Sequence, residues 1–242
     1  MAAEHELAVE EIEYPESDGQ PTAETDLHRD LMTDVILRLR ERYAARTDVY
    51  VSGNLLVYYV EGVPQKCLAP DCFVAFGPPP GDRRVFKTWD EGVFPAVVFE
   101  ITSKTTERED VLTKFRAYQD VWKVKELFMF DPTEDYLEPS MIGYRRSRGA
   151  LNVIRQVGGR IASKELGVTL ERGGTRLVIR DATTGGEIPL PHEADARKAR
   201  RQLRKSERDR ERAEAQLGSA NAELERLRAE LAALRGQRPP PA

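Results

Sequence analysis

The stretch FPAVVFEITSKTTEREDVLTKFRAY, residues 94–118, combines a buried strand with the start of a helix. Its apolar run, Ala96–Phe99, is typical of a strand that is covered on both faces. The run is interrupted by Glu100 and then resumes for one residue, Ile101. An ionised carboxylate removed from water costs several kcal/mol unless a cation or hydrogen-bond donors compensate it. Glu100 therefore needs a partner, and the nature of that partner bears directly on function.

Asp71 is the first candidate for a group that shares a site with Glu100. It follows Pro70 and begins the apolar run DCFVAF, residues 71–76. Two strands joined by a hairpin or a long loop can place both carboxylates at the same end of a sheet. Close carboxylates repel unless they share a proton or a cation, and Mg²⁺ needs only one or two of them as ligands. The pattern predicts a divalent-metal site in which the ion activates a water nucleophile.

The helix predicted after this strand offers a third group. At about 100° per residue, its apolar stripe consists of Val111, Phe115, Tyr118 and Trp122. Lys114 lies on the edge of that stripe, where its stem can pack on the core and its ammonium can reach the end of the sheet. There it would stabilise the charge of a transition state. Two simpler interpretations stay open: Lys114 pairs with Asp110 one turn earlier, or it neutralises Glu100 with no metal.

The chain divides into four segments by composition. Residues 1–24 form an acidic arm that lacks Lys and Arg, and we expect this arm to be mobile because it contains nothing that could bury a core. In residues 25–190 a helix capped by Thr25 or Asp26 precedes strands, the second helix and a series of hairpins. This order predicts a single α/β (α+β) domain. Residues 193–236 form a long helix, and residues 237–242 form a proline-rich tail.

The long C-terminal helix carries a heptad pattern. Leu203, Leu217, Leu224 and Leu231 fall on one heptad position, with small or leucine side chains on the partner position. An apolar seam of about five heptads with charged flanks predicts a coiled coil. A solvated single helix is the alternative. The expected partner is a second copy of the chain or another protein.

Composition excludes several classes of protein. Cys67 and Cys72 do not have the spacing of a zinc site, and free thiols fit a reducing cytosol. The acidic N-terminus is unlike a signal peptide, and no apolar run approaches the ~20 residues of a membrane span. We therefore expect a cytoplasmic protein without membrane segments. The formal net charge of −4 argues neither for nor against nucleic acid.

Four motifs follow one another along the chain. They are Pro70-Asp71, the run VVFEITSKTT around Glu100, ED-x3-K-x3-Y at residues 109–118 and VKELFMFDP at residues 124–132. Taken in order, these motifs resemble the Uma-type restriction endonucleases. That family belongs to the PD-(D/E)XK nuclease superfamily, and the resemblance covers roughly residues 25–190. It implies a restriction-endonuclease-like mixed sheet flanked by helices, with Asp71 and Glu100 as metal ligands. It also implies Mg²⁺ or Mn²⁺ as cofactor and nucleic acid, above all DNA, as substrate.

The sequence departs from the superfamily pattern at one position. The motif lysine is expected two residues after the glutamate, and this sequence has Thr102 at that position. The resemblance then implies that Lys114, on the following helix, takes the catalytic role of the motif lysine. The accessory site residues that we expect are Thr102, Ser103, Asp110 and His28.

We therefore expect a divalent-metal-dependent endonuclease with Asp71, Glu100 and Lys114 as catalytic residues. The alternative is a protein that keeps the nuclease fold without turnover and acts in binding or assembly through its coiled coil. A metal-dependent enzyme for small phosphate esters is a third hypothesis.

Overall fold

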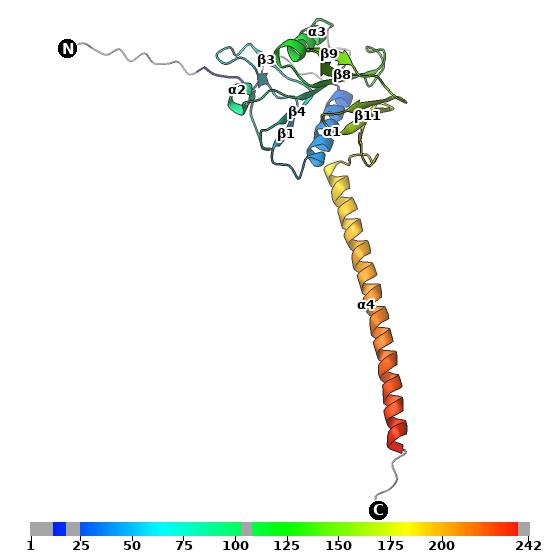
Figure 1. The fold of residues 1–242 in the computed structure, drawn as a ribbon. Helices are drawn as coiled ribbons and strands as arrows, with labels where there is room; N and C mark the ends of the chain where they lie inside the picture. Colours follow the sequence, from blue (N-terminus) through cyan, green and yellow to red (C-terminus); the bar gives the residue numbers. More distant parts are fainter. Residues whose placement is uncertain (1–11, 18–24, 103–107, 237–242) are drawn as a thin grey trace, which may run out of the picture. The chain divides into compact units, whose positions relative to one another are not determined.

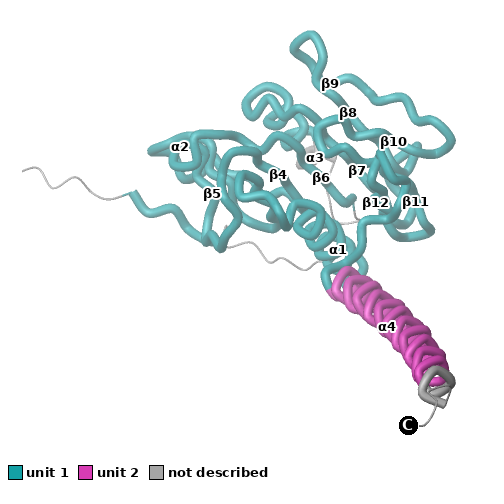
Figure 2. Tube along the Cα trace, turned by 60° about the horizontal axis from the view of Figure 1, so that its bottom comes forward, with its two compact units in different colours: residues 1–191 teal, residues 192–242 magenta. Residues whose placement is uncertain are grey.

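The computed structural model describes residues 12–17, 25–102 and 108–236, with side chains described in 12–17, 25–102 and 112–231. The chain separates into two compact units, Met1–Pro191 and His192–Ala242 (Figure 2). The first unit contains every strand of the described chain, and the second consists of a single helix.

A mixed six-stranded sheet runs through the first unit. Its strands, in spatial order, are β1 (Val49–Ser52), β4 (Cys72–Phe76), β6 (Val97–Ile101), β7 (Glu126–Phe130), β8 (Met141–Ser147) and β9 (Ala150–Val153). Strands β6 and β7 are parallel and the other neighbours are antiparallel. The central position of β6 explains why its apolar run is buried on both faces.

Each face of this sheet is covered by a helix and by a small sheet (Figure 1). On one face lie α1 (Asp26–Arg42) and the antiparallel strands β10 (Arg160–Ser163), β11 (Val168–Gly173) and β12 (Arg176–Asp181). On the other face lie the second helix and the strands β2 (Val57–Tyr58), β3 (Cys67–Leu68) and β5 (Phe86–Lys87), followed by the short α2 (Thr88–Glu91). This arrangement confirms the predicted mixed α+β fold.

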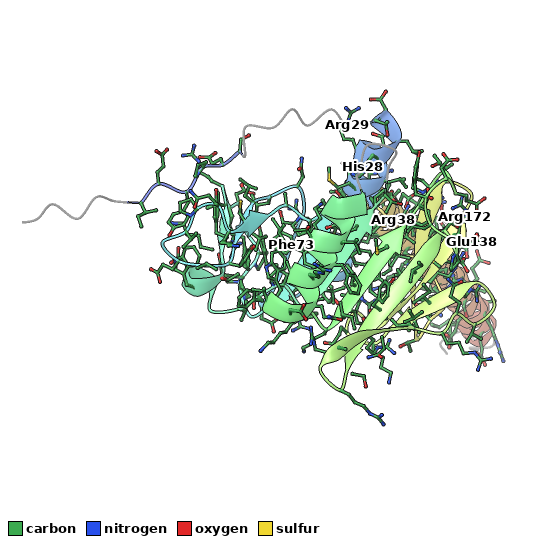
Figure 3. The ribbon with its side chains drawn as sticks, turned by 90° about the horizontal axis from the view of Figure 1, so that it is seen from above. His28, Arg29, Arg38, Phe73, Glu138 and Arg172 are labelled. Atoms are coloured by element: carbon green, nitrogen blue, oxygen red, sulfur yellow. The ribbon has the colours of Figure 1, made fainter. Side chains whose placement is uncertain are left out.

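Helix α1 begins as the sequence predicts. The Thr25 side chain accepts a hydrogen bond from the His28 backbone N–H at 3.2 Å, which caps the helix. The predicted apolar face is buried through Leu31, Val35 and Leu39. Arg38 is also buried and bonds Asp34 at 2.8 Å and Glu187 at 3.1 Å, so α1 is tied to the segment that follows β12 (Figure 3).

The second helix changes type along its length. The α-helix α3 (Arg108–Arg116) continues as the π-helix η1 (Ala117–Val121), in which the Trp122 N–H donates to the Ala117 carbonyl at 2.9 Å. The sequence analysis predicted one regular helix here. Insertions of π-helix are rare and frequently occur at functional sites.

A short N-terminal segment, residues 12–17, contacts the domain. The Tyr14 ring lies 5.1 Å from the Tyr58 ring and 5.2 Å from the Trp89 ring, and its hydroxyl accepts from the Gly62 N–H at 2.7 Å. Glu16 pairs with Arg84. Tyr14 thus supplies an aromatic contact that the acidic composition did not reveal, and the mobility expected for residues 1–24 stays a prediction.

Helix α4 (Pro191–Gly236) forms the second unit as one continuous helix (Figure 1). From Asp195 to Leu231 every described side chain is exposed. No helix within the described ranges combines the length and the apolar content that crossing a lipid bilayer requires.

Candidate active site

Asp71 and Glu100 come from the ends of neighbouring strands. The antiparallel register of β4 and β6 pairs Cys72 with Phe99 and Phe73 with Val98. Asp71 directly precedes β4, and its side chain accepts from the backbone N–H of Ile101, the residue after Glu100. The two carboxylates thus lie at one end of the sheet, as the sequence analysis expected.

Glu100 is held by two donors from the second helix. The Lys114 Nζ lies 3.1 Å from Oε2, and the Tyr118 hydroxyl donates to Oε1. Only 12% of the Glu100 side chain and 19% of the Lys114 side chain are exposed. Because Lys114 and Tyr118 are four residues apart, both lie on the helix face that covers β6.

Burial dominates the electrostatics of Glu100. Loss of hydration raises the pKa of Glu100 to about 7, and the negative charge of Asp71 acts in the same direction. The Lys114 ammonium and the Tyr118 hydroxyl oppose that rise because both favour the ionised carboxylate. Perturbed carboxylates of this kind cluster at functional sites, although structural ion pairs also produce them.

Asp71 is held by a different pair of donors. Its Oδ2 accepts from the Ile101 backbone N–H at 2.6 Å, and its Oδ1 lies 3.1 Å from the His28 Nε2. An ionised carboxylate can only accept, so the His28 Nε2 carries the proton in this contact. His28 comes from the first turns of α1 (Figure 3), and it is therefore a neighbour of the site, as expected.

The other accessory residues lie beside this cluster or outside the described part of the chain. The Thr102 hydroxyl donates to the Phe130 carbonyl at 3.3 Å, and Thr102 also lines the pocket beside Glu100. Its accessory role stays a prediction. Ser103 lies outside the described residues, and for Asp110 only the helical backbone is described.

Tyr118 is the site residue that sequence reasoning missed. The analysis assigned it to the core, and its ring is indeed fully buried, 5.0 Å from the Trp122 ring. Its hydroxyl nevertheless contacts Glu100, and it does so from the π-helical turn. The four-residue spacing from Lys114 was the available signal, because residues at i and i+4 share a helix face.

A small pocket opens beside Glu100. It is lined by Glu100, Ile101, Thr102, Lys114, Phe115, Tyr118, Leu127 and Met129. Its volume of about 20 Å³ is enough for a single water. A polar end formed by the Glu100–Lys114 pair and an apolar wall suit a small, oriented polar group.

Comparisons with known proteins identify the family of the chain. The model of the Uma2 family, described as "Putative restriction endonuclease", matches residues 4–176. Among solved structures, a chain described as "a putative nuclease belonging to DUF820 from Anabaena variabilis ATCC 29413" is similar at 12% identity and a TM-score of 0.44, over 59% of this chain and 75% of that chain. A search of curated proteins found no match. The family match spans well over half of the chain, and the chain therefore belongs to the Uma2 family.

Proposed function

We propose that the domain of residues 25–190 is a divalent-metal-dependent nuclease that hydrolyses phosphodiester bonds of nucleic acid, with DNA as the first substrate to test. One observation carries the proposal. Asp71 accepts from the Ile101 N–H, next to Glu100, so two carboxylates lie at the same end of the sheet, and a lysine ammonium lies 3.1 Å from one of them. The family match supports the same class of reaction.

The residues present fit a hard divalent cation. Among the side chains described, those of residues 12–17, 25–102 and 112–231, no group of three or more His, Cys, Asp and Glu forms a ready-made metal cluster. Mg²⁺ does not need such a cluster, because it retains several waters and takes one or two protein carboxylates. Asp71 and Glu100 supply that number. The Lys114 ammonium, 3.1 Å from Glu100, supports the view that positive charge compensates this carboxylate.

Each residue of the cluster then has a distinct role. Asp71 and Glu100 hold Mg²⁺ or Mn²⁺, which supplies Lewis-acid chemistry at the phosphate when it is bound. Lys114 places a compact positive charge next to the reacting phosphate and stabilises the charge of the transition state. Tyr118 and His28 hold the two carboxylates in place, which preserves the ligand geometry between turnovers.

Protonation of Glu100 limits this activity at low pH. A protonated carboxyl is a poor ligand for a hard cation, and the pKa of Glu100 is raised to about 7. Metal binding therefore displaces a proton from the site in the acidic range. We infer that activity rises with pH across neutrality.

The test is titration calorimetry with Mg²⁺ and Mn²⁺ on the full chain, followed by cleavage of linear and circular duplex DNA. Asp71→Asn and Glu100→Gln should each abolish binding and cleavage. Glu165→Gln is the matched control, because it removes one carboxylate charge from an exposed pair with Lys125. Equal metal binding in the wild type and both site variants would contradict the proposal.

A second candidate function rests on how completely the carboxylates are already compensated. Each oxygen of Asp71 and Glu100 accepts a hydrogen bond from the protein. Such a cluster also suits a protein that keeps the fold for binding or assembly without turnover. Absence of metal binding in the wild type would favour this candidate, and cleavage confined to small phosphate esters would instead favour a small-molecule enzyme.

Helix α4 suits assembly of two or more copies of the chain. Leu203, Leu217, Leu224, Leu227 and Leu231 are between 46% and 63% exposed in the single chain. A two-stranded coiled coil would cover these leucines. Light scattering should give an oligomer for the wild type and a monomer for Leu224→Glu. Assembly in the cytoplasm is consistent with the free thiols of Cys67 and Cys72.

A further inference from the structure

The first half of α4 concentrates positive charge in one stretch. Residues 196–206 contain six Lys and Arg and no Asp or Glu, whereas residues 213–236 contain three basic and four acidic side chains. Both stretches lie on the same exposed helix. Residues 196–206 therefore carry an excess of positive charge that residues 213–236 lack, and in residues 207–212 three acidic side chains alternate with three basic ones.

The basic side chains share one face of the helix. At about 100° per residue, six of them fall within a stripe about 100° wide. We call this set the basic stripe: Arg197, Arg201, Arg204, Lys205, Arg208 and Arg212. The centre of the leucine seam lies about 140° away, so a coiled coil formed through that seam would leave the basic stripe facing solvent.

Acidic residues are unevenly placed around the basic stripe: none stands three or four positions from Arg201, whereas Glu207 follows Arg204 by three residues and Asp209 follows Lys205 by four. Two ion pairs within α4 join Lys198 to Asp195 and Arg210 to Glu214, and neither cation belongs to the stripe. The stripe also places like charges four residues apart, as in Arg204 and Arg208, and such pairs destabilise a helix. A face that is only solvated would be expected to balance its charges, as residues 213–236 do.

An extended polyanion relieves this repulsion. From Arg197 to Arg212 the helix rises about 22 Å, and a nucleic acid duplex presents one phosphate charge per ~1.7 Å of its axis. Arginine also pairs with phosphate in a bidentate geometry, which favours phosphate over other anions. The basic stripe therefore matches the length, the sign and the chemistry of a duplex backbone.

We propose that the basic stripe of α4 is a second nucleic-acid contact, which binds the phosphate backbone of a duplex without reading its sequence. The choice of nucleic acid over other polyanions rests on the proposed nuclease function. The contact itself needs neither the metal nor catalysis. It would tether the enzyme to its substrate by charge, and its strength would depend steeply on salt.

The test is fluorescence anisotropy of a short labelled duplex with the full chain in chelator, at a series of salt concentrations. The double substitution Arg204→Gln and Arg208→Gln removes two charges from the stripe. It should lower the slope of log affinity against log salt by about 2 and weaken binding at low salt by about tenfold. The matched control is Arg210→Gln with Arg228→Gln, which removes two charges from another face of the same helix and should leave the slope unchanged. Circular dichroism checks that both variants keep their helix.

Three results would overturn the inference: no binding of the duplex by the wild type, the same loss in both double variants, or binding of phosphatidylserine vesicles in place of the duplex. The outcome is separable from that of the nuclease proposal. Binding in chelator does not involve Asp71 or Glu100, whereas metal titration does not involve α4. If the stripe variant loses duplex binding and still binds metal, the result would support both proposals.

Discussion

Tyr118→Phe is the most informative single change, because it removes one hydroxyl and leaves the fully buried ring in place. The hydroxyl donates to Glu100 Oε1, while Lys114 still contacts Oε2. A hydrogen bond to a charged group is worth about 1.5–3 kcal/mol. That stabilisation applies to the ionised carboxylate, so the pKa of Glu100 should rise further in the variant.

The expected cost in stability depends on pH. In the wild type the folded pKa of Glu100, about 7, exceeds its ordinary value of 4.5. The folded state therefore binds more protons between these values, and the free energy of unfolding falls as pH rises through that window. In Tyr118→Phe this fall should extend above pH 7. The destabilisation relative to the wild type should be small near pH 5 and reach about 1.5–3 kcal/mol near pH 9.

Urea unfolding in chelator, followed by tryptophan fluorescence, measures this difference, because Trp89 and Trp122 both lie in the first unit. Tyr144→Phe is the matched control. Its ring packs 5.1 Å from the Phe115 ring on the same side of the sheet, and among the described side chains no carboxylate contacts its hydroxyl. If the cost of Tyr118→Phe is the same at every pH, or if Tyr144→Phe shows the same trend, the assigned role of Tyr118 is refuted.

Further changes test other parts of the cluster and the fold. The Mg²⁺ affinity of the wild type should increase between pH 6 and pH 8, because the pKa of Glu100 is about 7 and binding releases its proton. Calorimetry in buffers of different ionisation enthalpy measures that proton release. Lys114→Met should lower the cleavage rate by about 10²–10³-fold with much less effect on metal affinity, since it removes transition-state charge stabilisation; an unchanged rate would exclude that role. Glu126→Ala should cost about 3–5 kcal/mol in urea unfolding, because this fully buried carboxylate accepts from Arg145 at 2.7 Å and from the Lys164 N–H at 3.0 Å. Tyr14→Ala should speed proteolysis before residue 25 while leaving the domain intact, and equal cleavage of both proteins would show that the Tyr14 contacts are weak.

Local sequence was sufficient to predict the helices and strands themselves. The alternation of side chains in VVFEI places Val97, Phe99 and Ile101 in one core cluster and Val98 in the other, because a strand has a period of two. Thr25 identified the start of α1, since its side chain can cap the helix. Helix α4 followed from a long interval without proline. Each of these inferences needs only residues within a few positions of one another.

The residues of the site could be predicted only in part from local sequence. Asp71 and Glu100 were identified because a carboxylate in an apolar run calls for compensation. Tyr118 was assigned to the core because a buried ring gives no sign of where its hydroxyl points. Its role depends on the π-helical turn and on the distance between the second helix and β6, neither of which periodicity reveals.

By itself, then, the sequence determined the strands, the capped first helix, the long terminal helix and the two carboxylates that need compensation. The tertiary structure alone decided that Asp71 lies beside the end of β6, that His28 joins from 43 residues away, and that Lys114 and Tyr118 share the two oxygens of Glu100. The reason is physical. Secondary structure follows from neighbours along the chain, whereas a site depends on strand register and helix docking, which only the packing of the whole core selects.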